Sequence, residues 1–584
     1  MVLDDHYHEP YSRTGIPPPN ANPEEGSDMA VASSTRPADV GLKREIGLIG
    51  AIWASETSII GSGWLFGSYF AAAAVGSAAL ICWVVAGIAV IILALVHAEL
   101  GGMYPVSGGT ARFPHFAFGS VAGISFGFFS WLQAVTVAPI ECFAVMRYGS
   151  YYWHGLFNPN ANGGTGVGNV THTGFVMTII LMAVFTGINF LAMRLFNKVN
   201  SAITWWKVAI PVLTIIILLF KFHPSNFTAG GGFIPKGVTF KDILAAIPGA
   251  GIVFAYLGFE QADQLAGEIK EPQKNLPRAI IGAILIGTAI YVMLQVVFIG
   301  ATPTDLLHHG FAGIPSTSPI AIGPFAGLAG LVGLGWLAVV LRIDAFVSPF
   351  GTGLVYQTST SHIGYGLARN RYYPQMFARV DKNGVPWFSL IIAFVAGLFF
   401  LLPFPSWHSL VSLVTGASVL MYAGAPLSLG AFRRQVPDLP RPYRMPAASV
   451  MSPIAFAIAN LIIYWSGFET IWKLGVCIVI GYVLIGIFMA FDSQRPPLDW
   501  RSAQWLPVYL IGMGLISWQG QFSGGAVAAP VNTNNIPFGI DLVVVIVFSI
   551  VIYYWAMAAR LPTEEMQNLV SRQSGEAVDP APHG

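Results

Sequence analysis

The chain has 584 residues, of which 54% are hydrophobic and only 10% are charged. This composition is too apolar for a soluble globular protein of that length, and it indicates that lipid surrounds most of the chain. The formal net charge of +1 gives no reason to expect a nucleic acid or a strongly acidic macromolecule as a partner.

Both ends of the chain differ from the rest in composition. Residues 1–43 are rich in Pro, Asn, Asp and Glu and lack an apolar stretch, so we expect a disordered cytoplasmic tail rather than a signal peptide. Residues 561–584 are expected to form a similar cytoplasmic tail. The three cysteines lie in apolar runs without paired spacing, which predicts small core residues rather than disulfides or metal ligands.

Fourteen segments are apolar enough to cross a membrane at about 20 residues per span. They lie near 46–75, 78–103, 119–149, 173–193, 199–221, 241–267, 277–300, 323–361, 386–402, 407–432, 450–467, 473–491, 504–520 and 540–559. The thirteenth is short and contains glycines, so a count of twelve or thirteen stays open. With the N-terminus in the cytoplasm, most of the 29 Lys and Arg residues fall on the inner side, as the positive-inside rule requires. The chain is therefore expected to lie in the cytoplasmic membrane with both termini inside.

The first span contains the triplet Gly61-Ser62-Gly63 at its middle. Each glycine is roughly 1 kcal/mol less favourable than alanine in a helix, so the helix unwinds easily there. A second half-helix then begins in mid-membrane, where its free amides and positive dipole end suit a carboxylate. A notch of small residues for close helix packing explains the triplet equally well.

The sixth span repeats this pattern. It contains Gly251 and Gly258, and Glu260 and Asp263 follow at once. Paired interruptions at corresponding places in two halves of a chain indicate a transporter built from inverted repeats, with its substrate between them. Spans one to five and six to ten are the predicted repeats.

Three segments resemble the amino acid–polyamine–organocation permease superfamily. They are IIGSGWLF in the first span, ELGGMYPVSGGTARFPHFAFG at 99–119 and FAYLGFEQADQLAGEIKEPQKNLPRAI at 254–280, within a resemblance that covers roughly residues 44–495. The segment at 342–381 is similar to the bacterial aspartate:proton symporter group. The resemblance implies an all-α membrane protein with a LeuT-type core of five plus five inverted helices. The corresponding domains are 44–221 and 241–432, followed by about four extra helices in 450–560.

The resemblance also implies where the substrate binds. The stretch of Ile60, Gly61, Ser62 and Gly63 corresponds to an unwound segment whose amides and hydroxyl hold the substrate α-carboxylate. On the sixth span, Phe254, Ala255 and Tyr256 correspond to positions whose carbonyls accept the α-ammonium, and Phe254 is the expected aromatic lid. Gly258, in the second interruption, completes the candidate site. Without the resemblance, an aromatic residue in such a span is expected to serve packing alone.

Lys207 lies about a third of the way into the fifth span. Lys198 precedes it by nine residues, about 14 Å of helix, which is long for a lysine that snorkels to the inner interface. In sodium-independent members of the superfamily, a lysine at this place fills the room of a sodium ion. Two cations about 4 Å apart repel each other by about 4 kcal/mol at an effective dielectric constant of 20, so we expect no sodium site. We also expect no cofactor, with a proton as the coupling ion. Lys207 is then a candidate proton carrier, or a fixed cation in an exchanger.

Arg342, Glu141 and Glu260 are the remaining candidates. Arg342, in the eighth span, either forms a structural ion pair with Glu141 or Glu260 or binds a second substrate carboxylate, which makes aspartate or glutamate the leading substrate. Glu141 either fills the space beside a helix kinked at Pro139 or carries the coupled proton. Glu260 is the third coupling candidate, after Lys207 and Glu141.

Together these patterns predict a secondary transporter that takes up amino acids by alternating access, coupled to protons. A sodium-independent exchanger of neutral amino acids or amines and a sensor with a transporter fold are the alternatives. No HExxH motif, histidine cluster or nucleophile–base arrangement points to an enzyme. The expected partners are a small amino acid and the lipid bilayer, and the sequence predicts no oligomeric state.

Overall fold

The computed structural model describes residues 46–106, 108–161, 168–191, 193–381, 384–402, 406–492, 495–523 and 532–573. Within these residues the protein is almost entirely helical, as predicted, and its one sheet is a two-residue antiparallel pair. In this sheet β1 (Phe157–Asn158) pairs with β2 (Asn169–Val170), with Phe157 opposite Val170. The predicted N-terminal tail lies outside the described residues.

The first predicted repeat begins with two short helices. Its helices are α1 (Leu48–Ile59), α2 (Ser62–Val75), α3 (Ala79–Met103), α4 (Gly109–Phe118), α5 (Ser120–Gly149), α6 (His172–Leu191) and α7 (Met193–Leu219). The second predicted repeat begins with three short helices. Its helices are α8 (Phe240–Gly249), α9 (Ile252–Tyr256), α10 (Gln261–Gln264), α11 (Pro272–Ala301), α12 (Pro319–Ile322), α13 (Pro324–Leu331), α14 (Gly335–Arg369), α15 (Trp387–Leu401) and α16 (Trp407–Gln435).

Further helices follow the second repeat. They are α17 (Ala448–Trp465), α18 (Phe468–Phe491), α19 (Trp500–Ala503), α20 (Trp505–Gln519), α21 (Ile540–Ala559) and α22 (Thr563–Gln573). Short 3-10 turns occur at Gly76–Ala78, Pro224–Phe227, Ala266–Glu268, Thr304–Leu307, Phe311–Gly313 and Gln375–Ala378. A helix is present at each of the fourteen predicted span positions, and nine helical stretches of the described residues are long and apolar enough to cross a membrane.

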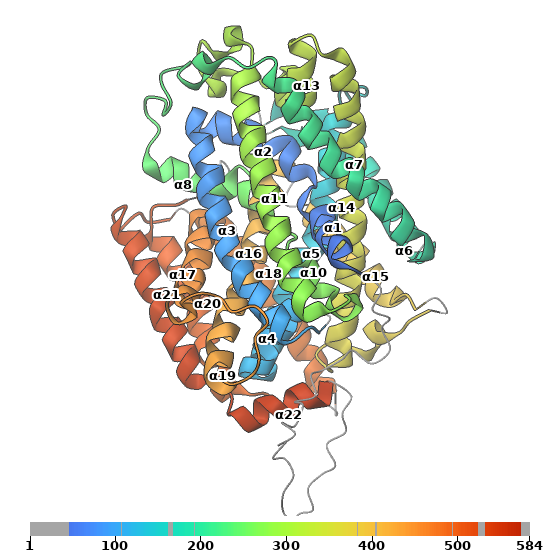
Figure 1. Ribbon diagram of the computed structural model, residues 1–584, viewed down its shortest axis with the longest axis vertical. Coiled ribbons are helices and arrows are strands. Elements are labelled where there is room, and N and C mark those ends of the chain that lie inside the picture. The colour runs from blue at the N-terminus through green and yellow to red at the C-terminus, as the bar shows by residue number, and fades with distance from the viewer. Residues whose placement is uncertain are drawn as a thin grey trace, which may run out of the picture. The chain divides into compact units, whose positions relative to one another are not determined.

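Two of the sequence predictions need correction. The predicted eighth span, 323–361, is two helices, because Gly333 adopts a φ of +81° between α13 and α14. The predicted C-terminal tail contains α22, which is a helix because its apolar residues find partners. Met566 is buried, and α22 packs against α4 at one end of the helical bundle (Figure 1).

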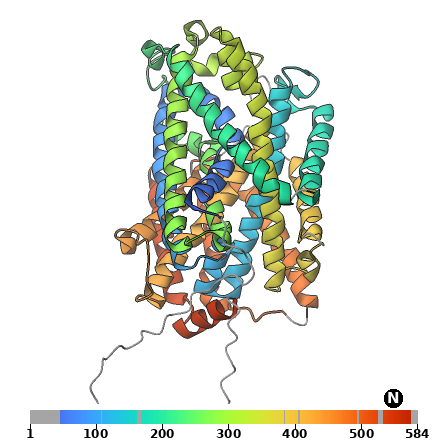
Figure 2. The same cartoon turned by 45° about the vertical axis from the view of Figure 1, so that its right-hand side comes forward.

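The helices divide into an interior group and a peripheral group. The most apolar 18-residue stretch of α5 and that of α16 are each 94% buried. The corresponding stretches of α6 and α18 are only 28% buried, so most of their apolar surface is available to lipid. The pairs α3–α11 and α5–α14 pack closely, and Figures 1 and 2 both show α3 beside α11. The short helices α1, α2, α8, α9 and α10 contact these interior helices, so both predicted interruptions lie in the protein interior.

Candidate functional site at two interrupted helices

The first interruption lies between α1 and α2. Ile60 (φ −84°, ψ 80°) and Gly61 (φ −111°, ψ −143°) leave the helical region of backbone space. The Gly61 amide donates to the Ile59 carbonyl at 3.0 Å instead of to Thr57, four residues earlier. The predicted interruption is confirmed. It frees the Thr57 carbonyl at the end of α1 and the first amides of α2 for other partners.

A carboxylate from α5 occupies the start of α2. The Ser62 amide donates to Oε2 and Oε1 of Glu141 at 2.9 and 3.3 Å, and Glu141 is fully buried. The dipole argument predicts an anion at this place, and the structure puts one of the protein's own carboxylates there. Gly61 makes the approach feasible, because a Cβ at this position would lie 2.7 Å from Oε1 of Glu141.

A lysine ammonium occupies the end of α1. Lys207 Nζ donates to the Thr57 carbonyl at 2.5 Å and to the Thr352 hydroxyl of α14 at 2.7 Å, and Lys207 is buried. This position at a helix C-terminus favours a cation. The predicted place of Lys207 beside the first interruption is confirmed. The carboxylates of Glu141 and Asp344 both attract the ammonium.

Asp344 has a role that the sequence did not reveal. Its Oδ1 accepts hydrogen bonds from the Trp206 indole at 2.9 Å and from the Ser348 hydroxyl at 2.8 Å. Because Trp206 precedes Lys207 on α7, Asp344 connects α14 to the helix that carries the lysine. Nothing local in the sequence indicates this contact, because Trp206 and Asp344 lie 138 residues apart.

The second interruption separates α8, α9 and α10. Gly251 and Gly258 have φ values of +80° and +114°, which glycine adopts far more easily than other residues. The Glu260 carboxylate accepts hydrogen bonds from the Gly258 amide at 3.0 Å and from the Tyr422 hydroxyl at 2.5 Å. The second predicted interruption is confirmed, and Glu260 stabilises its backbone.

The two interruptions are in direct contact. A Cβ at Gly63 would lie 2.7 Å from Cα of Ala255, and a Cβ at Gly258 would lie 2.6 Å from Cβ of Ser58. Both explanations of the Gly61-Ser62-Gly63 triplet, unwinding and close packing, therefore hold, each at a different glycine. Gly61 lies in the unwound segment, whereas Gly63 is a close-packing notch against α9.

Within the predicted carbonyl segment on α9, the Tyr256 side chain points toward α3. The Tyr256 hydroxyl donates to the Trp83 carbonyl at 3.0 Å, and its ring packs against the rings of Trp83 and Tyr291. Tyr256 thus contributes only its backbone to the region of the two interruptions. The Phe254 carbonyl accepts the Leu257 amide at 3.1 Å.

Trp407, the first residue of α16, is a second residue of this site that the sequence did not reveal. Its indole donates to the Ser62 hydroxyl at 2.8 Å. Its ring lies at right angles to that of Phe254, 5.8 Å between centroids, and parallel to that of Phe70 at 5.7 Å. The expected lid, Phe254, is therefore packed against an indole from a distant helix. The one signal in the sequence is an indole N–H in an apolar span, which needs a hydrogen-bond partner when buried.

Arg342 lies elsewhere than predicted. Its guanidinium carbon is 3.6 Å from the ring centroid of Tyr151, in a cation–π contact, and the side chain is half-buried. In the described part of the chain it pairs with neither Glu141 nor Glu260, so the predicted structural ion pair is wrong. The reason is that backbone amides and a tyrosine already bind those two carboxylates. A substrate contact of Arg342 stays a prediction.

A different arginine is buried close to the site. The guanidinium carbon of Arg147, on α5, lies 5.3 Å from the ring of Phe66, 5.1 Å from that of Phe70 and 5.0 Å from that of Phe157. The rings of Phe66 and Phe70 also contact Trp407. A chain of ring contacts, through Phe66 or Phe70 and then Trp407, thus connects Arg147 to Ser62.

This arrangement defines a class of protein. Two membrane helices are unwound where they touch, and charged side chains occupy both ends of the first gap. This is the arrangement of secondary transporters with inverted repeats. The chain belongs to the amino acid permease family, whose model matches residues 46–474. The protein is accordingly a multi-pass membrane protein, and the resemblance predicted from the three segments is confirmed.

Relatives with known names match almost the whole chain. The glutamate/serine transporter AimA of Bacillus subtilis (strain 168) is 34% identical over 534 residues, which cover 90% of this chain and 96% of the relative. The aspartate-proton symporter of the same organism is 35% identical over 528 residues, with 89% and 97% covered. The large neutral amino acids transporter small subunit 2 of Rattus norvegicus is 26% identical over 494 residues, with 81% and 86% covered.

Proposed function

We propose that the protein takes up acidic amino acids together with protons across the cytoplasmic membrane. The observation that carries this proposal is the Glu141 carboxylate on the Ser62 amide, at the helix end that suits a substrate carboxylate. The names of the two Bacillus subtilis relatives, which mention aspartate with protons and glutamate with serine, support the substrate class.

The proposed coupling follows from competition between two anions. The substrate α-carboxylate and the Glu141 carboxylate are both attracted to the start of α2. Two like charges about 4 Å apart repel each other by about 4 kcal/mol at an effective dielectric constant of 20. A proton on Glu141 removes this repulsion, so protonation and substrate binding favour each other. One proton then travels with each substrate, and its loss to the cytoplasm releases the substrate.

Lys207 supports coupling to protons rather than to sodium. The Thr57 carbonyl and the Thr352 hydroxyl are oxygen ligands of the kind that hard cations bind, and the Lys207 ammonium already donates a hydrogen bond to each of them. A sodium ion at this place would share two ligands with a buried positive charge. The proposal therefore includes no sodium site and no cofactor.

Lys207→Met is expected to destabilise the protein by about 1–3 kcal/mol, because the buried Thr57 carbonyl loses its charged donor and is left with the hydrogen bond from the Thr352 hydroxyl at 3.2 Å. The matched control is Lys473→Met on α18, where the lysine forms an i,i+4 ion pair with Glu469 and is partly exposed. Such a pair contributes about 0–1 kcal/mol. Thermal unfolding of the purified variants in detergent measures both effects. Equal losses of stability in Lys207→Met and Lys473→Met would contradict the proposed role of the Lys207 ammonium at the end of α1.

Arg147 and Arg342 are the two candidate partners for the second substrate carboxylate, and their variants should behave differently. We propose Arg147 as its partner, because Arg147 is buried against the rings of Phe66 and Phe70, which pack on the indole that donates to Ser62. Arg147→Gln should lower the affinity for aspartate relative to serine by about 10- to 100-fold, the value of a charge-assisted hydrogen bond. Arg342→Gln, at its contact with Tyr151, should leave this ratio unchanged. Competition binding with the purified variants measures the ratio, and the reverse pattern would assign the carboxylate to Arg342.

The experiment that tests the function is uptake by purified protein in liposomes. Radiolabelled aspartate, glutamate and serine are offered with and without an imposed pH gradient, acid outside. Accumulation of aspartate above equilibrium only with the gradient, and without any need for sodium, supports the proposal. Counterflow without gradient-driven accumulation would instead favour the exchanger. Substrate binding without flux would favour the sensor.

A further inference from the structure

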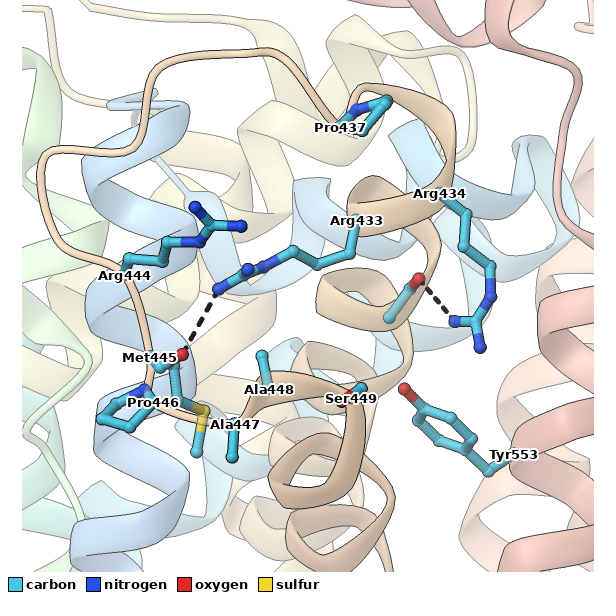
Figure 3. Close-up of a pocket in the computed structure, with 11 residues that line it drawn as sticks. Arg433, Arg434, Pro437, Arg444, Met445, Pro446, Ala447, Ala448, Ser449 and Tyr553 are labelled. Carbon is cyan, nitrogen blue, oxygen red and sulfur yellow. Dashed lines mark hydrogen bonds between the residues drawn. The ribbon is translucent and has the colours of Figure 1, made fainter.

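A cavity of about 600 Å³ lies away from the two interruptions, where α16 ends and α17 begins. Three arginines line it, Arg433, Arg434 and Arg444, together with Ser449 at the start of α17 and Tyr553 of α21. Figure 3 shows Arg433 and Arg444 on one side of the cavity and Arg434 and Tyr553 on the other. The positive-inside rule predicts that this end of the bundle faces the cytoplasm.

The positive charges around this cavity exceed the negative ones. The Glu99 carboxylate accepts a bidentate pair of hydrogen bonds from Arg433 at 2.7 and 2.6 Å, and it also contacts Arg441 at 3.1 Å. One carboxylate thus forms ion pairs with two guanidinium groups. Arg434 donates to the Gly430 carbonyl at 2.8 Å, and it forms no ion pair with a carboxylate among the described residues.

Arg444 adds a further charge. It is exposed, and it has no hydrogen bond or ion pair in the part of the chain that the structure describes. Asp438, in the same loop, forms no ion pair with a described residue. A positive-inside distribution explains basic residues in this loop, but it does not explain why three of them surround a cavity.

The backbone beside the arginines favours an anion as well. Ala447, the residue before α17, has φ +45° and ψ 41°, an unusual conformation for a residue other than glycine. It directs the chain so that Ala448 and Ser449, the first residues of an 18-residue helix, line the cavity. No side chain caps this helix end, so its amides and positive dipole end reinforce the arginines.

The two helices that line the cavity also carry exposed apolar residues. Val450 and Ile454 of α17 and Val551 and Tyr554 of α21 are exposed, and Val450 and Tyr554 directly follow cavity residues. An acyl chain fits this surface, whereas a soluble phosphate leaves it uncovered. We infer that the cavity binds the phosphate group of an anionic phospholipid whose acyl chains lie along α17 and α21. Basic pockets between membrane helices on the cytoplasmic side bind such headgroups.

The test measures lipid binding to the purified full-length protein by native mass spectrometry, with phosphatidylglycerol and phosphatidylcholine as probes. We expect preferential binding of phosphatidylglycerol. Arg434→Gln and Arg444→Gln should each weaken that binding about 5-fold, and the double variant about 25-fold. Both side chains are exposed, so the variants are expected to fold, which their melting temperatures without added lipid confirm.

The matched control is Arg501→Gln on α19, an exposed arginine that does not line the cavity. It should change phosphatidylglycerol binding by less than about 2-fold. An equal loss in this control, or no loss in the double variant, would overturn the inference. Glycerol phosphate and inorganic phosphate form the last arm of the test. If either binds as tightly as phosphatidylglycerol, the occupant is a soluble phosphate and the lipid assignment is wrong.

Discussion

Replacing Glu141 by glutamine should abolish uptake driven by a pH gradient while leaving exchange of substrate intact. The glutamine side chain keeps an oxygen that accepts the Ser62 amide, so the start of α2 retains its partner. It cannot bind or release the coupled proton, because it is neutral at every working pH. Gradient-driven accumulation of aspartate in liposomes should therefore fall to the level seen without a gradient, whereas counterflow should continue at a measurable rate.

The control for this variant is Glu469→Gln on α18. It makes the same chemical change at a carboxylate that is bound by a side chain, the Lys473 ammonium at 2.6 Å. Glu141, in contrast, is bound by the backbone amide of Ser62. Gradient-driven uptake by the control should match that of the wild type. If Glu141→Gln still accumulates aspartate in response to the gradient, Glu141 is not the proton carrier, and Lys207 or Glu260 takes its place as the leading candidate.

The two charged side chains at the first gap explain why a broken helix is stable inside the protein. The carbonyl freed at the end of α1 accepts from Lys207, and the amide freed at the start of α2 donates to Glu141. Each charge lies at the helix end whose dipole favours it. Removal of the Glu141 carboxylate leaves the Ser62 amide without this acceptor, whereas removal of Lys207 leaves the Thr57 carbonyl with the Thr352 hydroxyl at 3.2 Å. In either case the remaining buried charge loses the opposite charge that attracts it. This coupling links the protonation of Glu141 to the geometry of the interruption.

Much of this fold was predictable from local sequence. Apolar stretches separated by charged loops predict the positions of the spans, and the glycines predict both interruptions because their effect on a helix is local. Lys207 was identifiable because a lysine in an apolar span is energetically costly and therefore indicates a function. The boundary between α13 and α14 was missed because glycine is common throughout these spans.

The contacts between distant segments were not predictable in the same way. Trp407 reaches Ser62 across 345 residues of sequence, and only the packing of α16 against α2 brings them together. Arg342 and Arg147 both lie in apolar surroundings, and nothing local in the sequence says which one is buried. The choice depends on the aromatic residues that α2 presents to α5, which form part of the tertiary structure.

Gly63→Ala should reduce transport by roughly 5- to 150-fold. Its new Cβ would lie 2.7 Å from Cα of Ala255, and since this neighbour is backbone rather than a flexible side chain, α2 and α9 must move apart. Overpacking of this kind costs about 1–3 kcal/mol, or roughly 5- to 150-fold in an equilibrium. Initial rates of aspartate uptake in liposomes measure the loss.

The matched control for Gly63→Ala is Gly475→Ala on α18, where an added Cβ meets nothing within 4 Å. Alanine is the better helix former by roughly 1 kcal/mol, so this variant should transport like the wild type and unfold at the same or a higher temperature. If Gly63→Ala behaves in the same way, α2 and α9 tolerate a wider separation than their contact in this structure. The close approach of the two interrupted helices would then not be a requirement of the transport cycle.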